Sequence, residues 1–197
     1  MLSVVNLADK IQPQKGLLLM QSKYVKILLT GPPGCGKTTA ITKIVAGLPR
    51  TNVAGFYTRE IREGGVRKGF RWKRLDGAAG TLAHVNIKSR FRVGRYGVDI
   101  PGFERDVAGV LDVNRSDVEL FVLDEIGKME CFSEKFVTAA RGLFNSEKSV
   151  LATVAQKGLG LIAEIKQHPG TELINLTRQN RDEIVTELIR RMSVLGK

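Results

Sequence analysis

Cysteine and histidine are scarce in this sequence, and their scarcity excludes several kinds of site. Cys35 and Cys131 are the only cysteines among 197 residues, and His84 and His168 are the only histidines. Two widely separated cysteines without a metal-type spacing argue against a disulfide scaffold and against a zinc site. We therefore predict a reduced, cytoplasmic protein whose two histidines are ordinary surface or packing residues.

Long apolar runs are also missing from the sequence. A membrane-spanning helix needs about 20 predominantly apolar residues, whereas the longest candidates, residues 17–20 and 25–29, are only a few residues each. Polar residues interrupt the N-terminal region, which argues against a secretory signal. We therefore expect no membrane contact.

Acidic residues are few, and the resulting positive charge is unevenly placed. The chain has 31 lysines and arginines against 20 acids, a net charge of +11, and residues 59–95 hold eleven of the basic residues but only three acids. This segment could hold a polyanionic nucleotide, contact nucleic acid, or form a solvated face, and its composition leaves all three open.

The length suits one α/β domain with a substantial core. Residues 1–22 show no sustained hydrophobic period, and Gln12-Pro13-Gln14-Lys15-Gly16 is typical of a linker. We predict a poorly packed N-terminal tail over residues 1–22 and a single domain over residues 23–197. We expect a monomer.

Glycines, in contrast, are concentrated where they indicate a phosphate-binding loop. Residues 31–38 read GPPGCGKT and match the pattern G-x-x-x-x-G-K-[ST] at every fixed position. An apolar stretch precedes the loop and a helix-like stretch follows it, so backbone N–H groups and the positive end of the helix converge on one anion site. The candidate phosphate-binding residues are Gly31, Pro32, Pro33, Gly34, Cys35, Gly36, Lys37, Thr38 and Thr39.

Two residues of the loop have predicted chemical roles, and a second motif completes them. Lys37 supplies positive charge to the β- and γ-phosphates, and the Thr38 hydroxyl is a candidate Mg²⁺ ligand. Residues 118–125, VELFVLDE, form an apolar strand that ends in an acidic pair. We predict that Asp124 lies beside Thr38 and binds Mg²⁺, and that Glu125 polarises an attacking water.

The acidic pair also bears on the class of P-loop protein. A second carboxylate beside the first favours hydrolases and motors over switch GTPases. It indicates an extra strand between the phosphate-loop strand and the acidic strand, as in RecA-like and AAA-type ATPases. Residues 114–117, NRSD, resemble the guanine-reading N-K-x-D pattern, but arginine replaces lysine and the segment precedes the acidic strand. Guanine specificity therefore has no support.

Alternating apolar patterns predict the fold. Glu63-Gly64-Gly65 is a turn signal between two strand-like runs, residues 56–61 and 66–75, and indicates an antiparallel hairpin. Further strands are expected at residues 53–58, 82–87, 91–93, 118–123, 149–154 and 172–176, and helices at residues 38–47, 101–111, 133–144, 159–167 and 181–195. This order predicts an α/β P-loop NTPase fold, a mainly parallel sheet with helices on both faces, RecA/AAA-like strand order and an antiparallel hairpin extension.

The predicted strand at residues 149–154 raises a further pair of candidates. Thr153 lies near its carboxyl end and Gln156 just beyond it. In a parallel sheet the ligand lies at the carboxyl ends of the strands. These side chains are equally compatible with sensing the γ-phosphate, positioning water, or ordinary structural roles.

Together the motifs resemble the family of small P-loop nucleoside-triphosphatases, the group that includes the cancer-related nucleoside-triphosphatase. The segments that match this family are GPPGCGKTT, GFYTREIREGGVRKGF, VGRYGVDI, LDEIGKME, ATV and LTRQNRD, in that order. The resemblance extends from about Tyr24 to the C-terminus. It implies Mg²⁺-dependent hydrolysis of ATP, GTP and other nucleoside triphosphates to diphosphate and phosphate, with low base specificity.

The resemblance also extends to residues whose roles the sequence does not define. It places Lys128 near the nucleotide and matches Asn180 and Arg181 to an Asn-Arg-Asp element. Arg181 is as compatible with a salt bridge at a helix start as with a nucleotide contact. Two other functions stay open, a nucleotide or nucleoside kinase and a nucleic-acid-stimulated ATPase, although a nucleic-acid partner is not favoured.

Overall fold

The computed structural model describes residues 24–49 and 51–193, so the predicted tail over residues 1–22 lies outside the described residues. The strands are β1 (Lys26–Thr30), β2 (Val53–Glu63), β3 (Val66–Arg74), β4 (Ala79–His84), β5 (Arg92–Val93), β6 (Tyr96–Val98), β7 (Leu120–Ile126), β8 (Ser149–Val154) and β9 (Thr171–Asn175). The α-helices are α2 (Lys37–Ala46), α3 (Ile100–Asp106), α4 (Glu134–Phe144), α5 (Leu161–Gln167) and α6 (Arg181–Met192), with 3₁₀ turns η2 (Ala108–Leu111) and η3 (Glu130–Phe132).

One mixed sheet organises these elements, in the order β5-β6-β4-β3-β2-β7-β8-β1-β9. The pairs from β2 through β7, β8 and β1 to β9 are parallel. Strand β8 separates the phosphate-loop strand β1 from the acidic strand β7, which confirms the predicted RecA-like order. The predicted hairpin is β2 and β3, and β4, β6 and β5 continue it as an antiparallel half of the sheet.

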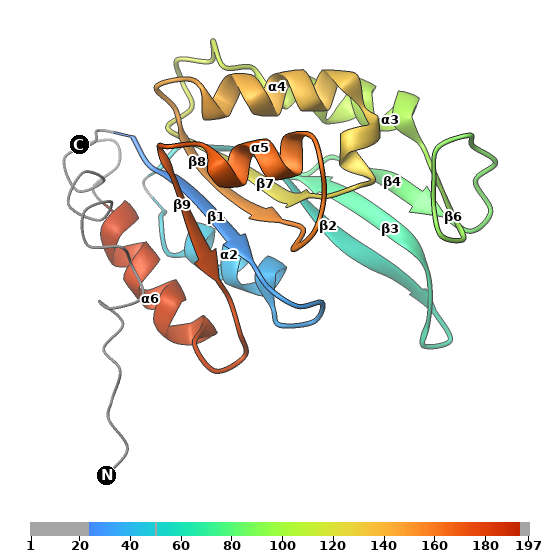
Figure 1. The fold of residues 1–197 in the computed structure, drawn as a ribbon, viewed down its shortest axis with the longest axis horizontal. Helices are drawn as coiled ribbons and strands as arrows, with labels where there is room; N and C mark the ends of the chain where they lie inside the picture. The colour runs from blue at the N-terminus through green and yellow to red at the C-terminus, as the bar shows by residue number, and fades with distance from the viewer. Residues whose placement is uncertain (1–23, 50, 194–197) are drawn as a thin grey trace.

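Helices cover both faces of the parallel half, as predicted (Figure 1). Helices α3, α4 and α5 lie on one face, whereas α2 and α6 lie on the other. On the first face Phe56 of β2 packs edge-to-face on Phe103 and Phe136, with ring centroids 5.6 and 6.0 Å apart. On the second face Ile41 of α2 and Leu188 of α6 belong to a separate buried cluster. The two apolar cores fix the sheet between the helical layers.

Local signals explain where several helices begin and end. Helix α4 begins after Ser133, whose hydroxyl accepts a hydrogen bond of 3.0 Å from the Phe136 N–H and caps the helix. Helix α5 ends before His168-Pro169, since a residue that precedes proline disfavours helical geometry. Among the described residues every helix is too short or too polar to cross a membrane.

Several predicted boundaries are wrong. The strand expected over residues 82–87 is β4, Ala79–His84. The helix expected over residues 101–111 ends at Asp106 and gives way to the 3₁₀ turn η2. The apolar strand expected to end before the acidic pair continues through it, because β7 pairs with β8 again at Ile126 after a shift of register. Asp124 and Glu125 therefore lie within the sheet, at the edge where the carboxyl ends of β1 and β8 also meet.

Candidate active site

The loop between β1 and α2 has the backbone of an anion cradle. Gly34 (φ +73°) and Gly36 (φ +101°) both adopt the left-handed conformation that favours glycine. Helix α2 begins at Lys37 without a side-chain cap, so its first N–H groups have no capping partner within the helix. The loop therefore presents backbone donors and the positive end of α2 to one point, as phosphate binding requires.

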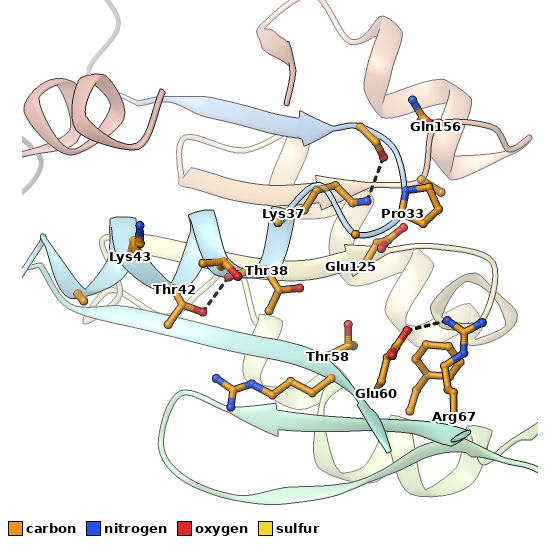
Figure 2. Close-up of a pocket in the computed structure, with 18 residues that line it drawn as sticks. Pro33, Lys37, Thr38, Thr42, Lys43, Thr58, Glu60, Arg67, Glu125 and Gln156 are labelled. Atoms are coloured by element: carbon orange, nitrogen blue, oxygen red, sulfur yellow. Dashed lines mark hydrogen bonds and ion pairs between the residues drawn. The ribbon is translucent and has the colours of Figure 1, made fainter. Parts of the chain in front are cut away.

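A cleft of about 830 Å³ opens beside this loop and includes most of the predicted phosphate-binding residues. Lys37 lines the cleft, and its Nζ donates a hydrogen bond of 3.1 Å to the Gly31 carbonyl oxygen (Figure 2). From the predicted set, the cleft is lined by Gly31, Pro33, Gly34, Gly36, Lys37, Thr38 and Thr39. Pro32 is exposed outside the lining, and the Cys35 side chain is buried in the core shared by α2 and α6.

Asp124 is buried at the base of this loop. Only 1% of its surface is exposed, and its Oδ1 accepts a hydrogen bond of 2.6 Å from the Thr153 hydroxyl. Thr153 is itself buried, so its side chain holds the Asp124 carboxyl and does not reach the cleft. Gln156, in contrast, lines the cleft. The contact between Thr153 and Asp124 arises because β7 and β8 are neighbours.

The second oxygen of Asp124 fits a metal ion. Oδ2 is buried without a hydrogen-bond partner among the described residues, and an unsatisfied buried oxygen is costly. Burial raises the pKa of Asp124 to about 6, against the lowering effect of the nearby Thr153 and Thr38 hydroxyls. Within the described part of the chain, no three histidine, cysteine or acidic side chains gather into a metal site of their own. A Mg²⁺ ion held by few protein oxygens together with substrate phosphates suits this arrangement.

Glu125 differs from Asp124 in its surroundings. It is half-buried and lines the cleft, facing the loop that carries Pro33 and Lys37 (Figure 2). Asp124 is buried whereas Glu125 lines the cleft, so the two carboxylates lie in different surroundings. Lys128, which the resemblance places near the nucleotide, is exposed and does not line the cleft.

Glu130 is a third carboxyl group near the site, and the sequence does not predict it. It is 5% exposed, and its Oε2 accepts a hydrogen bond of 3.1 Å from the Gly127 N–H. Burial is the main cause that raises the pKa of Glu130 from its ordinary 4.5 to about 8, and the charges of Glu125 and Asp124 contribute to this increase. Glu130 is therefore neutral at pH 7 in the folded chain. A glutamate in the motif LDEIGKME offers no sequence signal for this burial.

We predict that Glu130 makes stability fall as pH rises. Between pH 4.5 and 8 the folded chain retains a proton that the unfolded chain has lost, so this stabilisation is complete at low pH and disappears above pH 8. Glu130→Gln keeps an acceptor for Gly127 and does not titrate. Relative to wild type, the variant should gain roughly 2 kcal/mol between pH 6 and pH 8. Denaturant unfolding at pH 6, 7 and 8 measures the difference, and parallel curves would contradict the prediction.

The C-terminal motif with Asn180 and Arg181 lies against the phosphate loop. The Asn180 side chain accepts a bond of 2.8 Å from the Thr177 N–H and donates one of 3.0 Å to the Asn175 carbonyl oxygen, so it shapes the turn before α6. Arg181 forms the alternative salt bridge, 3.2 Å from Asp182. Its side chain packs so closely that a Cβ at Gly36 would lie 2.9 Å from Arg181 Cδ.

The antiparallel half of the sheet supplies cleft residues that the sequence analysis did not identify. They come from β2 and β3: Thr58, Arg59, Glu60, Arg67 and Phe70. The two segments belong to the motif GFYTREIREGGVRKGF, which was the available signal. Only Arg59 and Arg67 of the eleven basic residues in positions 59–95 line the cleft described here. Most of this positive charge therefore lies away from the phosphate loop.

Comparison with known proteins agrees with the fold and the motifs. The model of a protein family described as NTPase matches residues 26–189. The nucleoside-triphosphatase THEP1 of Thermotoga maritima is 40% identical over 167 residues, which cover 84% of this chain and 94% of that protein. The human cancer-related nucleoside-triphosphatase is 37% identical over 178 residues, with coverage of 83% and 94%.

Solved structures show the same likeness. The crystal structure of THEP1 from Aquifex aeolicus superimposes with a TM-score of 0.78 at 34% identity, covering 88% of this chain and all of that one. The solution structure of a human cancer-related nucleoside triphosphatase gives a TM-score of 0.72 at 35% identity, with the same coverage. The phosphate loop, the acidic strand and this breadth of similarity lead to one conclusion: the chain belongs to the NTPase family.

Proposed function

We propose that this protein hydrolyses nucleoside 5′-triphosphates to nucleoside diphosphate and phosphate in a Mg²⁺-dependent reaction. The observation that most supports this proposal is the convergence of Lys37, Thr38 and Glu125 on one cleft, with the unsatisfied Asp124 buried beneath it. The names of the relatives, nucleoside-triphosphatases, point to the same reaction.

The phosphate loop binds and orients the substrate in this proposal. Backbone N–H groups around Gly34 and Gly36 and at the N-terminus of α2 donate hydrogen bonds to the phosphate oxygens. Lys37 exchanges its bond to the Gly31 carbonyl for the β- and γ-phosphates. Thr38 and Asp124 would hold Mg²⁺, which supplies positive charge to the phosphate oxygens.

Glu125 acts on the nucleophile. Its carboxylate lies in the cleft and is free to accept a hydrogen bond from a water aligned with the γ-phosphate. Thr153 holds Asp124 in place through their bond of 2.6 Å, so it is a positioning residue. Lys128 stays a candidate without a contact in the cleft.

We also propose low base specificity. The side chains of the guanine-like segment pair locally: Arg115 pairs with Asp117 at 2.5 Å, and Asn114 bonds to Asp112 at 3.0 Å. Its backbone carbonyls at Arg115 and Asp117 accept hydrogen bonds from Lys148 and Asn52. None of these residues lines the cleft. A site that contacts mainly phosphates discriminates little among bases.

We propose in addition that the protein is a cytoplasmic monomer. Both cysteines are free thiols, which suits a reducing compartment. The large apolar side chains exposed in the described residues are Val66, Leu159 and Leu173, from separate elements. Isolated apolar residues of this kind do not form an interface.

The test is a phosphate-release panel with ATP, GTP, CTP, UTP and their deoxy forms. We expect phosphate release from every nucleotide, at rates within about one order of magnitude of one another. A site that makes no specific contact with the base loses little transition-state binding when the base is changed. EDTA should abolish release, and excess Mg²⁺ should restore it. Release that needs a nucleoside or nucleotide acceptor would instead identify a kinase. Strong stimulation by RNA, lost as salt rises, would favour a nucleic-acid-dependent ATPase.

A further inference from the structure

The mechanism above leaves one wall of the cleft unused. The phosphate loop forms one side, and β2 and β3 form the other, where Glu60 and Arg67 lie opposite Pro33 and Lys37 (Figure 2). Phe70 of β3 also lines the cleft. In this view Glu125 lies between the two walls. Side chains on the hairpin therefore face the reacting end of a bound triphosphate.

Arg67 is the most firmly held cation on that wall. Its Nη1 donates a bond of 2.6 Å to Glu60 Oε1, and its Nε donates one of 3.2 Å to the Tyr96 hydroxyl. The guanidinium also lies 5.3 Å from the centre of the Phe70 ring, which lies within the range of a cation–π contact. These groups come from β2, β3 and β6, so three strands fix one side chain.

The remaining nitrogen of Arg67 is available to a ligand. Nη2 makes no hydrogen bond within the described residues, although the residue lines the cleft. The other cations in the lining differ. Lys43 pairs with Asp182 at 2.9 Å outside the reaction path, and the Arg59 side chain lines the cleft without a hydrogen bond or ion pair among the described residues. Donors that are fixed before the reaction stabilise developing charge best.

A fixed hydrogen-bond donor with a positive charge would offset the negative charge in the cleft. Glu60 and Glu125 line the cleft and Asp124 is buried beneath it, so carboxylates lie beside a highly charged substrate, and Lys37 is the one cation that the phosphate loop supplies. In hydrolysis the water oxygen bonds to the γ-phosphorus as the bond to the bridging oxygen breaks, and that electron pair leaves with the diphosphate. The water proton passes to Glu125. An arginine beside the γ-phosphoryl oxygens stabilises this transition state.

We propose that Arg67 is a catalytic residue of this chain, which contacts the γ-phosphoryl group through Nη2 while Glu60, Tyr96 and Phe70 hold its guanidinium in place. The inference rests on the proposed function, because it assigns a residue to the same hydrolysis. No second protein is needed to supply the arginine.

The experiment compares steady-state phosphate release by wild type, Arg67→Ala and Arg67→Lys. We expect kcat to fall on the order of 10²- to 10³-fold in both variants, with KM changed only a few-fold, because the contact forms in the transition state. Lysine keeps the charge but loses the fork that bonds Glu60, Tyr96 and the phosphoryl group together. Free guanidinium ion should partly restore Arg67→Ala.

Arg71→Ala is the matched control. Arg71 is an exposed arginine of the same strand that does not line the cleft, so its loss should leave kcat unchanged. Binding of ADP with aluminium fluoride, which resembles the transition state, should weaken in Arg67→Ala, whereas binding of ADP alone should not. Thermal unfolding shows whether each variant is folded, and Arg67→Lys, which retains the packing on Phe70, serves if alanine unfolds the hairpin.

The outcomes separate this inference from the proposed function. Absence of phosphate release from wild type would refute the hydrolase itself. Release by wild type with an unchanged kcat in Arg67→Ala would refute the role of Arg67. A loss confined to Arg59→Ala would assign the role to the other arginine of the cleft. A fall in melting temperature with normal kcat would leave Arg67 as a structural clamp, which also overturns the proposal.

Discussion

Glu125→Gln should bind Mg²⁺–nucleotide with nearly the affinity of wild type and hydrolyse it 10²- to 10⁴-fold more slowly, by an order-of-magnitude estimate for a lost general base. The amide has the size and shape of the carboxylate, but it cannot accept a proton. The half-buried side chain lines the cleft and makes no hydrogen bond or ion pair within the described residues, so folding should be unaffected. Single-turnover hydrolysis, together with binding of a fluorescent nucleotide, measures the two effects separately.

Glu147→Gln is the control for this variant. Glu147 is exposed between α4 and β8, away from the cleft, and the substitution makes the same change of charge. Its kcat should equal that of wild type. Normal turnover by Glu125→Gln would show that another group positions the water, and Glu60, which lies on the opposite wall, would be tested next.

The parts of the fold that the sequence predicts are those encoded locally. The glycine spacing of residues 31–38 predicts a loop between a strand and a helix, and β1 and α2 flank it in the structure. The acidic pair Asp124 and Glu125 predicts a strand between β7 and β1, which is β8. In both cases a short motif predicts the adjoining strands and helices, because its chemistry requires one arrangement of those elements.

The parts that the sequence does not predict depend on pairing between distant segments. Thr153 meets Asp124 only through the register of β8 on β7, and Arg67 meets Tyr96 across 29 residues through β3, β4 and β6. Periodicity cannot specify such a register. Burial of Glu130 likewise follows from the packing of η3 under β7, which no local pattern reports.

Positive charge illustrates the same limit. The basic segment over residues 59–95 leaves a nucleotide, a nucleic acid and solvent as partners, because a one-dimensional count does not show direction. In the structure Arg62 and Arg67 both pair with Glu60, and Arg74 pairs with Asp76. Two arginines of the segment line the cleft, so the phosphate loop accounts for a small part of the charge. Phosphate release measured with and without RNA tests whether the other basic residues of this segment bind nucleic acid.

Lys37→Ala should reduce turnover below detection and weaken triphosphate binding. Lys37 differs from Glu125 because its charge acts on the substrate before the reaction as well as during it, so both KM and kcat should change. Among residues 24–49 and 51–193, Nζ bonds only to the Gly31 carbonyl oxygen, 3.1 Å away in the same loop. Its removal creates no buried unsatisfied charge, and the fold should persist. We expect a loss in kcat/KM on the order of 10³-fold or more.

Comparison with Lys135→Ala distinguishes this effect from a general loss of positive charge. Lys135 is exposed on α4, 3.5 Å from Glu104 and outside the cleft, and an exposed pair of this kind contributes little. Calorimetric titration with a non-hydrolysable triphosphate and with the diphosphate should show a larger loss of affinity for the triphosphate in Lys37→Ala, because the role proposed for the lysine is to bind the β- and γ-phosphates. Equal losses for both ligands would place the charge of Lys37 elsewhere on the nucleotide, and unchanged turnover would mean that the phosphate loop is not the site of hydrolysis.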